Sequence, residues 1–150
     1  MKTRDRSSSP MRVLIVDDNA DEANALDAIF STCGHGTRVA RSGAEALEVA
    51  QTFVPDAAFI ELDMPTMSGF ELARRLRSMP RWLTVPLLAI SGPQRTEDEH
   101  RAVQAGFDDH LVMPSSIERL EDTLRGAAQH MVSRRVHRVP FRTVARSASA

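Results

Sequence analysis

Residues 57–72, AAFIELDMPTMSGFEL, connect a short apolar segment to a segment with helical spacing. The connection contains Glu61 and Asp63, followed by a Met-Pro step and a glycine. An apolar run as short as Ala57–Ile60 is typical of a parallel strand that is buried on both faces. Ser68, with Glu71 three residues later, is typical of a capping box at a helix N-terminus. The stretch therefore predicts a strand, an acidic loop and a helix, in that order.

The same order of strand and helix recurs five times along the chain. The expected strands are Val13–Val16, a short segment around Val39, Ala57–Ile60, Val85–Ile90 and His110–Val112. The first expected helix follows Asn19, and the others follow capping boxes that begin at Ser42, Ser68, Thr96 and Ser115. Alternating strands and helices form a parallel sheet with right-handed crossovers and helices on both faces. We therefore expect an α/β protein with the flavodoxin-like (βα)5 three-layer sandwich, whose five parallel strands have the order 2-1-3-4-5.

The length and composition of the chain exclude several classes of protein. A chain of 150 residues is long enough for one ordinary domain with its own hydrophobic core. Although 42% of the residues are hydrophobic, no apolar run approaches the roughly 18 residues that a membrane-spanning helix needs. Cys33 is the only cysteine, which excludes an internal disulfide and suits a reducing compartment. These features predict a cytoplasmic protein without membrane contact.

The formal net charge of -1 conceals an uneven distribution of charged residues. Residues 131–150 contain five arginines and no acid, whereas residues 11–130 have a net charge of -8. We interpret residues 1–10 as a flexible leader, residues 11–130 as the domain, and residues 131–150 as a basic tail into which an apolar stripe extends the last helix. An acidic domain argues against a nucleic-acid-binding core, so we expect nucleic acid contact only weakly and through the tail.

Acidic and hydroxyl side chains follow the expected strands at their carboxyl ends. These residues are Asp17 and Asp18 after the first strand, Glu61 after the third, Ser91 after the fourth, and Met113 with Pro114 after the fifth. The carboxyl ends of parallel strands meet at one edge of the sheet, where ligands bind in such folds. We therefore expect three carboxylates to converge there, and carboxylate oxygens are the ligands that Mg2+ prefers.

Over about residues 11–130 the chain resembles the receiver domain of bacterial two-component response regulators. Four motifs carry the resemblance, in order: VLIVDDN at 13–19, ELDMPTMSGFEL at 61–72, LLAISG at 87–92 and AGFDDHLVMP at 105–114. The resemblance implies that an acidic pair binds Mg2+ and that an Asp after the third strand accepts a phosphoryl group. It also implies that a Ser or Thr and a Lys contact that phosphoryl group.

The sequence departs from this family pattern at two positions that the chemistry needs. The acceptor position is Glu61, whose extra methylene moves the carboxylate into the space of a phosphoryl group. The Lys position is Met113, which offers neither a charge nor a donor, and Lys2 is the only lysine in the chain. For the other roles, the resemblance points to Asp17, Asp18, Glu61 and the backbone carbonyl of Asp63 as metal ligands, and to Ser91 and His110 at the switch positions.

Without a lysine, the negative charge of the acidic pocket can be compensated in two ways. Either a divalent cation binds there, or one carboxyl stays protonated near neutral pH. Because the acceptor and the lysine are both replaced, we expect Mg2+ to bind weakly or not at all.

These departures predict a degenerate receiver, or pseudo-receiver, and not an enzyme. We expect a stand-alone module that binds proteins in signal transduction without being phosphorylated. Its expected partner is a sensor kinase or a downstream regulator, and homodimer formation is a further mode of contact. The alternative is a phosphorylatable receiver of a two-component phosphorelay, which uses Mg2+ and carries phosphate on Glu61 or a neighbouring Asp. An enzyme or flavin binder on the same fold is less favoured, since the chain has no paired nucleophile and base, one Trp and no Tyr.

The opposite charges of domain and tail lead to a prediction. Residues 131–150 have a charge of +5 and are tethered to a domain of charge -8, so we expect the tail to bind the domain or a neighbouring subunit weakly. Deleting residues 133–150 should change the oligomeric state or the partner affinity at low salt, and added salt should reduce that difference. Sedimentation velocity and partner titrations at two salt concentrations check this. Identical behaviour of the two proteins at low salt would contradict it.

Overall fold

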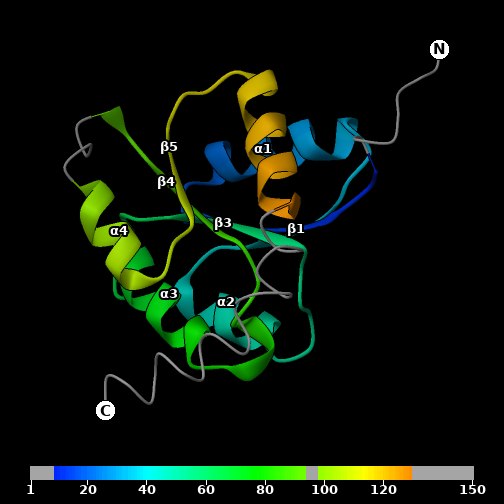
Figure 1. Cartoon of the computed structure of the whole chain (residues 1–150). Coiled ribbons are helices and arrows are strands. Elements are labelled where there is room, and N and C mark those ends of the chain that lie inside the picture. Colours follow the sequence, from blue (N-terminus) through cyan, green and yellow to red (C-terminus); the bar gives the residue numbers. More distant parts are fainter. Residues whose placement is uncertain (1–8, 94–97, 130–150) are drawn as a thin grey trace.

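Five short strands form one parallel sheet in the order β2-β1-β3-β4-β5, which confirms the predicted topology (Figure 1). The strands are β1 (Arg12–Val16), β2 (Gly36–Ala40), β3 (Ala57–Glu61), β4 (Leu87–Ser91) and β5 (Asp109–Val112). This computed structural model describes residues 9–93 and 98–129. Apart from residues 9 and 10, the predicted leader and the predicted tail lie outside the described residues, and so does the predicted extension of the last helix.

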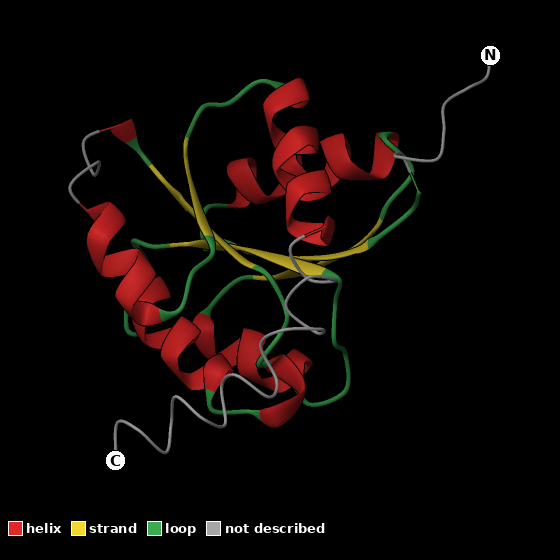
Figure 2. Cartoon of the chain, in the orientation of Figure 1, coloured by secondary structure: helices red, strands yellow, loops and turns green. Residues whose placement is uncertain are grey.

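Helices connect successive strands and cover both faces of the sheet (Figure 2). They are α1 (Ala20–Thr32), α2 (Gly43–Ala50), α3 (Gly69–Arg77), α4 (Glu99–Ala105) and a last helix that is described over residues 117–129. A short 3-10 helix, η2 (Pro80–Trp82), follows α3. Among the described residues, no helix has the length and apolar character needed to cross a membrane.

The side chains of β1 show why both faces of the sheet are covered. Val13 and Ile15 belong to one core cluster with α1 and the last helix, whereas Leu14 and Val16 belong to a second cluster with α2, α3 and α4. All four side chains are fully buried. Successive side chains of a strand point to opposite faces, so a strand that is apolar throughout needs a helical layer on each side.

Three predicted helix starts are confirmed by side-chain hydrogen bonds. The side chains of Asn19, Ser42 and Ser68 each accept a hydrogen bond from the backbone N–H three residues later, at distances of 2.9, 3.1 and 3.2 Å. These bonds satisfy amide groups that a helix leaves unpaired in its first turn. The short loops before α1, α2 and α3 are thereby fixed, which matters for α1 because its first turn contributes to the site described below.

The predicted start of the last helix is wrong by one residue. Ser116 caps this helix, because its hydroxyl accepts a hydrogen bond from the N–H of Arg119 at 3.1 Å. Ser115, the predicted cap, instead donates to the carbonyl of Val112 at 2.9 Å and so closes the turn after β5. The predicted cap at Thr96 lies outside the described residues.

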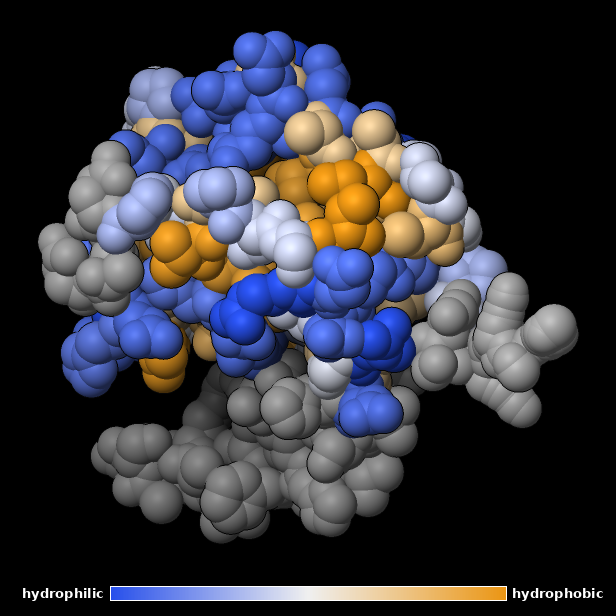
Figure 3. Space-filling model, turned by 90° about the horizontal axis from the view of Figure 1, so that it is seen from above, coloured by the Kyte–Doolittle hydropathy of each residue, from blue (hydrophilic) through white to orange (hydrophobic). Residues whose placement is uncertain are grey.

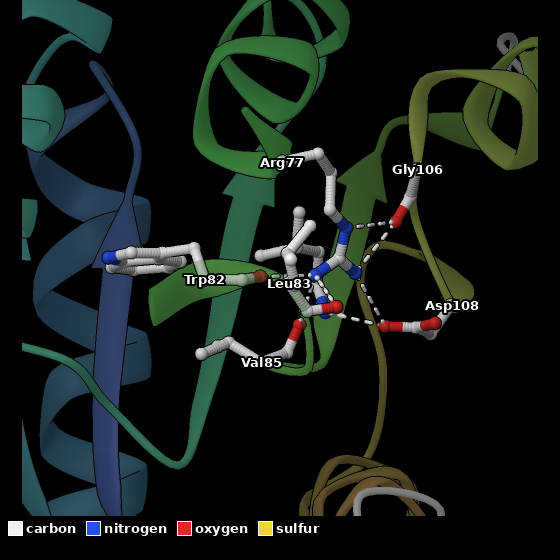
Figure 4. A network of polar contacts seen from close by, with 7 residues as sticks. Arg77, Trp82, Leu83, Val85, Gly106 and Asp108 are labelled. Atoms are coloured by element: carbon white, nitrogen blue, oxygen red, sulfur yellow. Dashed lines mark hydrogen bonds and ion pairs between the residues drawn. The ribbon is translucent and has the colours of Figure 1, made fainter. Parts of the chain in front are cut away.

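Arg77, at the end of α3, joins several backbone segments at the amino end of β4 and β5 (Figure 4). Its guanidinium donates hydrogen bonds of 2.7 to 3.3 Å to the carbonyls of Trp82, Leu83, Val85 and Gly106 and to the carboxylate of Asp108. Asp108 also accepts a hydrogen bond from the first amide of β4 at 2.9 Å. The predicted fourth strand is therefore too early by two residues, because the Val85 carbonyl faces Arg77 and the sheet begins at Leu87.

Gly106 ends α4 beside this network. Its φ of +114° lies in the left-handed region, which glycine adopts without steric cost. A Cβ atom at this position would lie 2.8 Å from the Cγ of Arg77. Both the backbone conformation and the close approach of the arginine therefore require glycine here.

Loss of the Arg77 guanidinium should destabilise the domain strongly. Arg77 and Asp108 have side chains that are only 16% and 13% exposed, so Arg77→Met removes the cationic partner of a poorly solvated carboxylate and the hydrogen bonds to several carbonyls. We expect the free energy of unfolding to fall by about 3–5 kcal/mol. The matched control is Arg75→Met on the same helix, whose pair with Glu71 is 54% and 43% exposed and should cost less than about 1 kcal/mol. Urea unfolding followed by the fluorescence of buried Trp82 compares the variants, and equal losses would count against this role.

Candidate functional site

Asp17 and Glu61 are neighbours because of the register between β1 and β3. Val16 pairs with Ile60, so Asp17 and Glu61 are the next residues on the two adjacent strands. Asp17 is fully buried, and only 9% of Glu61 is exposed. Two carboxylates are therefore held together at the carboxyl edge of the sheet, where water screens their charges poorly.

The two oxygens of the Asp17 carboxylate have different surroundings. Oδ1 accepts a hydrogen bond from the N–H of Asn19 at 3.0 Å. Oδ2 is buried and has no hydrogen-bond partner within the described part of the chain. A buried oxygen without a partner costs about 1–3 kcal/mol, and more when it is charged. Oδ2 therefore marks a place for a proton or a cation.

Glu61 is held in place by its own loop and by α3. Its Oε2 accepts a hydrogen bond from the N–H of Asp63 at 2.9 Å. The first turn of α3 approaches so closely that a Cβ on Gly69 would lie 2.4 Å from the Glu61 carbonyl oxygen. The resemblance assigns the carbonyl of Asp63 to the metal. The side chain of Asp63 is exposed and lines a cleft at this edge of the sheet, which is described below.

The third carboxylate of the cluster comes from Glu22 on α1, a residue that the sequence analysis missed. One oxygen each from Asp17, Glu22 and Glu61 lies within 4.8 Å of the other two. Only three residues separate β1 from α1, so the first turn of the helix stays close to the strand end. Acids are common in a first helical turn because they interact favourably with the helix dipole, so Glu22 gave no signal of its own. Its position one turn beyond the acidic pair was the only clue.

Asp18, the predicted third member of the cluster, lies elsewhere. Its side chain is exposed and lines the cleft, but it is not part of the group of mutually close oxygens. Its backbone carbonyl accepts a hydrogen bond from Nη2 of Arg41 at 3.5 Å, so a guanidinium lies nearby. The acidic pair is therefore divided between the buried cluster, which contains Asp17, and the exposed rim, which contains Asp18.

Burial makes Asp17 and Glu61 hold protons more tightly than ordinary carboxyls do. Burial and the contact with Glu22 raise the pKa of Asp17 from 3.8 to about 7. Burial also raises the pKa of Glu61 from 4.5 to about 7, with the hydrogen bond from Asp63 acting against the shift and the charge of Asp17 adding to it. Two ionised carboxylates cannot form a hydrogen bond with each other, because neither has a hydrogen to donate. When Asp17 is protonated, its carboxyl group can donate a hydrogen bond to Glu22. In the absence of a cation, Asp17 and Glu61 therefore bind protons near neutral pH.

On the side of β4 and β5, Ser91 and His110 form a direct hydrogen bond. The Ser91 Oγ lies 2.7 Å from the His110 Nε2, and Ser91 is only 1% exposed. The structure thus pairs the two residues of the predicted switch positions with each other. Met113, at the predicted Lys position, packs partly buried against the core cluster under α1 and the last helix, and it also lines the cleft.

A cleft of about 610 Å³ opens above the acidic cluster. Its lining residues in the described chain include five acids and no basic residue: Asp17, Asp18, Glu22, Glu61 and Asp63 are the acids. The cleft lies at the carboxyl ends of β1, β3 and β5, which is the edge that the sequence predicted. Its electrostatic character suits a cation and disfavours a free anion.

The family model of the response regulator receiver domain matches residues 13–125 of this chain. The chain belongs to this family. Receiver domains are signalling modules of two-component systems, and they act through protein partners such as kinases and effector domains. This chain has the strand order and the acidic sheet edge that are expected of a receiver domain.

Several curated proteins are similar to this chain over most of its length. A 14.6 kDa protein from the sodA1 3′ region of Leptolyngbya boryana is 35% identical over 104 residues, which are 69% of this chain and 79% of that protein. The transcriptional regulatory protein KdpE of Mycobacterium tuberculosis is 32% identical over 117 residues, 78% of this chain and 50% of that protein. The gliding motility regulatory protein of Myxococcus xanthus is 34% identical over 110 residues. The alignments span half of KdpE and 14% of the Myxococcus protein.

Solved structures show the same fold. The receiver resembles the chemotaxis protein CheY4 of Vibrio cholerae with a TM-score of 0.75 and 27% identity, covering 79% of this chain and 99% of that chain. The receiver domain of the Francisella response regulator 1452 gives a TM-score of 0.72 and 29% identity, covering 79% and 97%. The two likenesses extend over nearly the whole of each solved chain.

The acidic cluster has the donor set that the Mg2+ of a receiver domain needs. Receiver domains bind Mg2+ in an acidic pocket, and hard cations take carboxylate oxygens together with water. Asp17, Glu22 and Glu61 would supply the carboxylates, the unpartnered Oδ2 of Asp17 could coordinate a cation directly, and the cleft has room for water. A bound cation would supply the positive charge that the cleft lacks.

The raised pKa values of Asp17 and Glu61 predict that stability falls as pH rises. Between about pH 4 and pH 7 the folded state binds more protons than the unfolded chain, so the stabilisation is complete below pH 4 and is lost as pH rises through about 7. Without divalent cations, we expect the free energy of unfolding to drop by roughly 2–4 kcal/mol from pH 5 to pH 8. Urea unfolding in EDTA measures this drop.

Isosteric variants provide the control for this pH dependence. Glu61→Gln should reduce it to the contribution of Asp17, whereas Glu48→Gln, which makes the same chemical change at an exposed site on α2, should leave it as in the wild type. A pH dependence that is the same in all three proteins would show that the cluster is not its source.

Proposed function

We propose that this receiver is a pseudo-receiver that binds protein partners in two-component signalling without being phosphorylated. The observation that carries the proposal is the environment of Glu61, which occupies the acceptor position of the family pattern. Its Oε2 is tied to the amide of Asp63, and its carboxylate lies in a cluster with Asp17 and Glu22. A side chain that is hydrogen-bonded to its own loop and lies between two other carboxylates is poorly placed to attack a phosphorus atom.

Both geometry and protonation disfavour Glu61 as a nucleophile. Phosphoryl transfer depends mainly on in-line positioning, and the extra methylene of Glu61 moves its oxygens away from the place of an Asp carboxylate. Burial raises the pKa of Glu61 to about 7, so much of this group is protonated at neutral pH, and the protonated form is not nucleophilic.

In the part of the chain that the structure describes, the positions that would stabilise a phosphorylated product have other surroundings. The Lys position is occupied by the apolar Met113, and the chain has no lysine beyond Lys2. The hydroxyl of Ser91 is already bonded to His110. A phosphoryl group on the end of β3 would therefore face the acids of the cleft without a charge-assisted hydrogen bond from a cationic side chain of the described lining.

A second candidate function is a phosphorylatable receiver of a phosphorelay. The intact acidic cluster favours it, because the cation that receiver chemistry uses has a fitting donor set here. In this case Glu61 or a neighbouring Asp would carry the phosphoryl group. The experiment below distinguishes the two candidates.

The proposed partner is a sensor kinase or a downstream regulator, with self-association as a further mode. Val103 on α4 and Ile117 at the start of the last helix are large apolar side chains that are 66% and 52% exposed. Seen from above, the layer of α1 and the last helix presents apolar areas framed by hydrophilic residues (Figure 3). Such areas suit protein contacts. Because the domain is acidic, we expect nucleic acid to bind only weakly and through the basic tail.

Incubation with acetyl phosphate and Mg2+ tests the pseudo-receiver proposal. The wild type should show no phosphoryl adduct by intact mass spectrometry. Glu61→Asp restores an acceptor of the usual length and should give slow, short-lived labelling. The double variant Glu61→Asp with Met113→Lys adds a charge-assisted contact of about 1.5–3 kcal/mol, which corresponds to roughly tenfold to hundredfold higher occupancy.

The labelling of the double variant should disappear in EDTA, and Met113→Lys alone should stay unlabelled because it retains Glu61. A wild-type protein that accepts one phosphoryl group at Glu61 in the presence of Mg2+ would overturn the proposal and establish the phosphorylatable receiver.

A further inference from the structure

We infer that Glu22 takes the place of Asp18 as a ligand of the divalent cation, so that the cation site of this receiver consists of Asp17, Glu22 and Glu61. The family pattern assigns the acidic pair after the first strand to the metal, and the structure divides that pair. This inference concerns the identity of the ligands, and it holds whether or not Glu61 accepts a phosphoryl group.

The distances within the cluster suit a small hard cation. Mg2+ binds oxygen at about 2.0–2.1 Å, so two ligands on opposite sides of the ion lie about 4 Å apart. The three carboxylate oxygens lie within 4.8 Å of one another, which is close to that spacing. Three carboxylates lined up at this distance repel one another unless protons or a cation lie between them.

The unpartnered oxygen of Asp17 is a second, independent sign of a ligand. Asp17 is fully buried, its Oδ1 is occupied by the Asn19 amide, and its Oδ2 has no partner in the described chain. The polar groups nearest to it in the cluster are carboxylates, which accept and do not donate. A divalent cation satisfies Oδ2 and the two glutamates at the same time.

The start of α1 explains why Glu22 and not Asp18 completes the cluster. Asp17 accepts from the amide of Asn19, and the side chain of Asn19 accepts from the amide of Glu22 at 2.9 Å. This chain of hydrogen bonds holds the first turn of α1 over the end of β1. Asp18 lies between these residues on the exposed rim, beside the guanidinium of Arg41, which already supplies positive charge there.

The site also has a structural consequence. Asp17 follows β1, Glu61 ends β3 and Glu22 belongs to α1, so one cation connects two central strands and a helix. Binding therefore fixes the N-terminus of α1 against the sheet. Because Glu61 is itself a ligand, the cation also holds the acceptor position in a single conformation.

Mn2+ titration of the full chain, followed by the electron paramagnetic resonance signal of free Mn2+, tests the ligand set. The wild type should bind one Mn2+ ion, and Mg2+ should compete for it. Glu22→Gln should weaken binding by roughly tenfold or more, and Asp18→Asn by less than about threefold. Asp21→Asn is the matched control, because it removes an exposed acid from the same helical turn and should behave like Asp18→Asn.

Carboxyl 13C spectra of the wild type give a second readout that does not depend on the folding of any variant. Addition of Mg2+ should shift the carboxyl resonances of Asp17, Glu22 and Glu61, while that of Asp18 stays close to its position in EDTA. The inference is overturned if Asp18→Asn weakens binding more than Glu22→Gln, if the Asp18 resonance shifts and that of Glu22 does not, or if the wild type binds no cation.

Discussion

Parallel pairing of β1 and β3 is the constraint on which the site depends. Both strands are central and apolar on both faces, so a shift of one residue would exchange the two faces of either strand. The observed register pairs Val16 with Ile60 and so places Asp17 beside Glu61. The protein accepts two buried carboxylates at a cost in stability, which is typical of a functional site and unusual in a core.

Charged groups at the two ends of the sheet differ in whether they have partners of opposite charge. At the amino end of β4 and β5, the guanidinium of Arg77 meets Asp108 and several carbonyls, so each buried polar group has a partner. At the carboxyl end, five acids line a cleft without a basic side chain in its described lining. The first arrangement is complete within the chain and holds the fold, whereas the second is complete only when protons or a cation are bound.

The departures from the family pattern form a consistent set. A lysine at Met113 would neutralise the cluster and pair with phosphoryl oxygens, and a free hydroxyl at Ser91 would contact the same group. In this receiver the apolar side chain joins the core and the hydroxyl bonds to His110. Glu61 meanwhile reaches into the cluster with Asp17 and Glu22. These contacts within the domain are the basis on which we propose a pseudo-receiver.

The sequence by itself determined the layered fold and three helix caps, which follow from local periodicity and from capping chemistry. The strand order and the edge where the acids gather followed from the rules that govern alternating strands and helices. It misplaced the cap at Ser115 and the start of β4, since turn geometry and the contact with Arg77 decide those boundaries. It also missed Glu22 and the partners of Arg77, because these contacts join residues that are far apart in the chain. Only the tertiary structure decided that Asp17 is buried without a partner while Asp18 is exposed, because burial depends on the helices that cover the strand ends and not on the order of two identical residues.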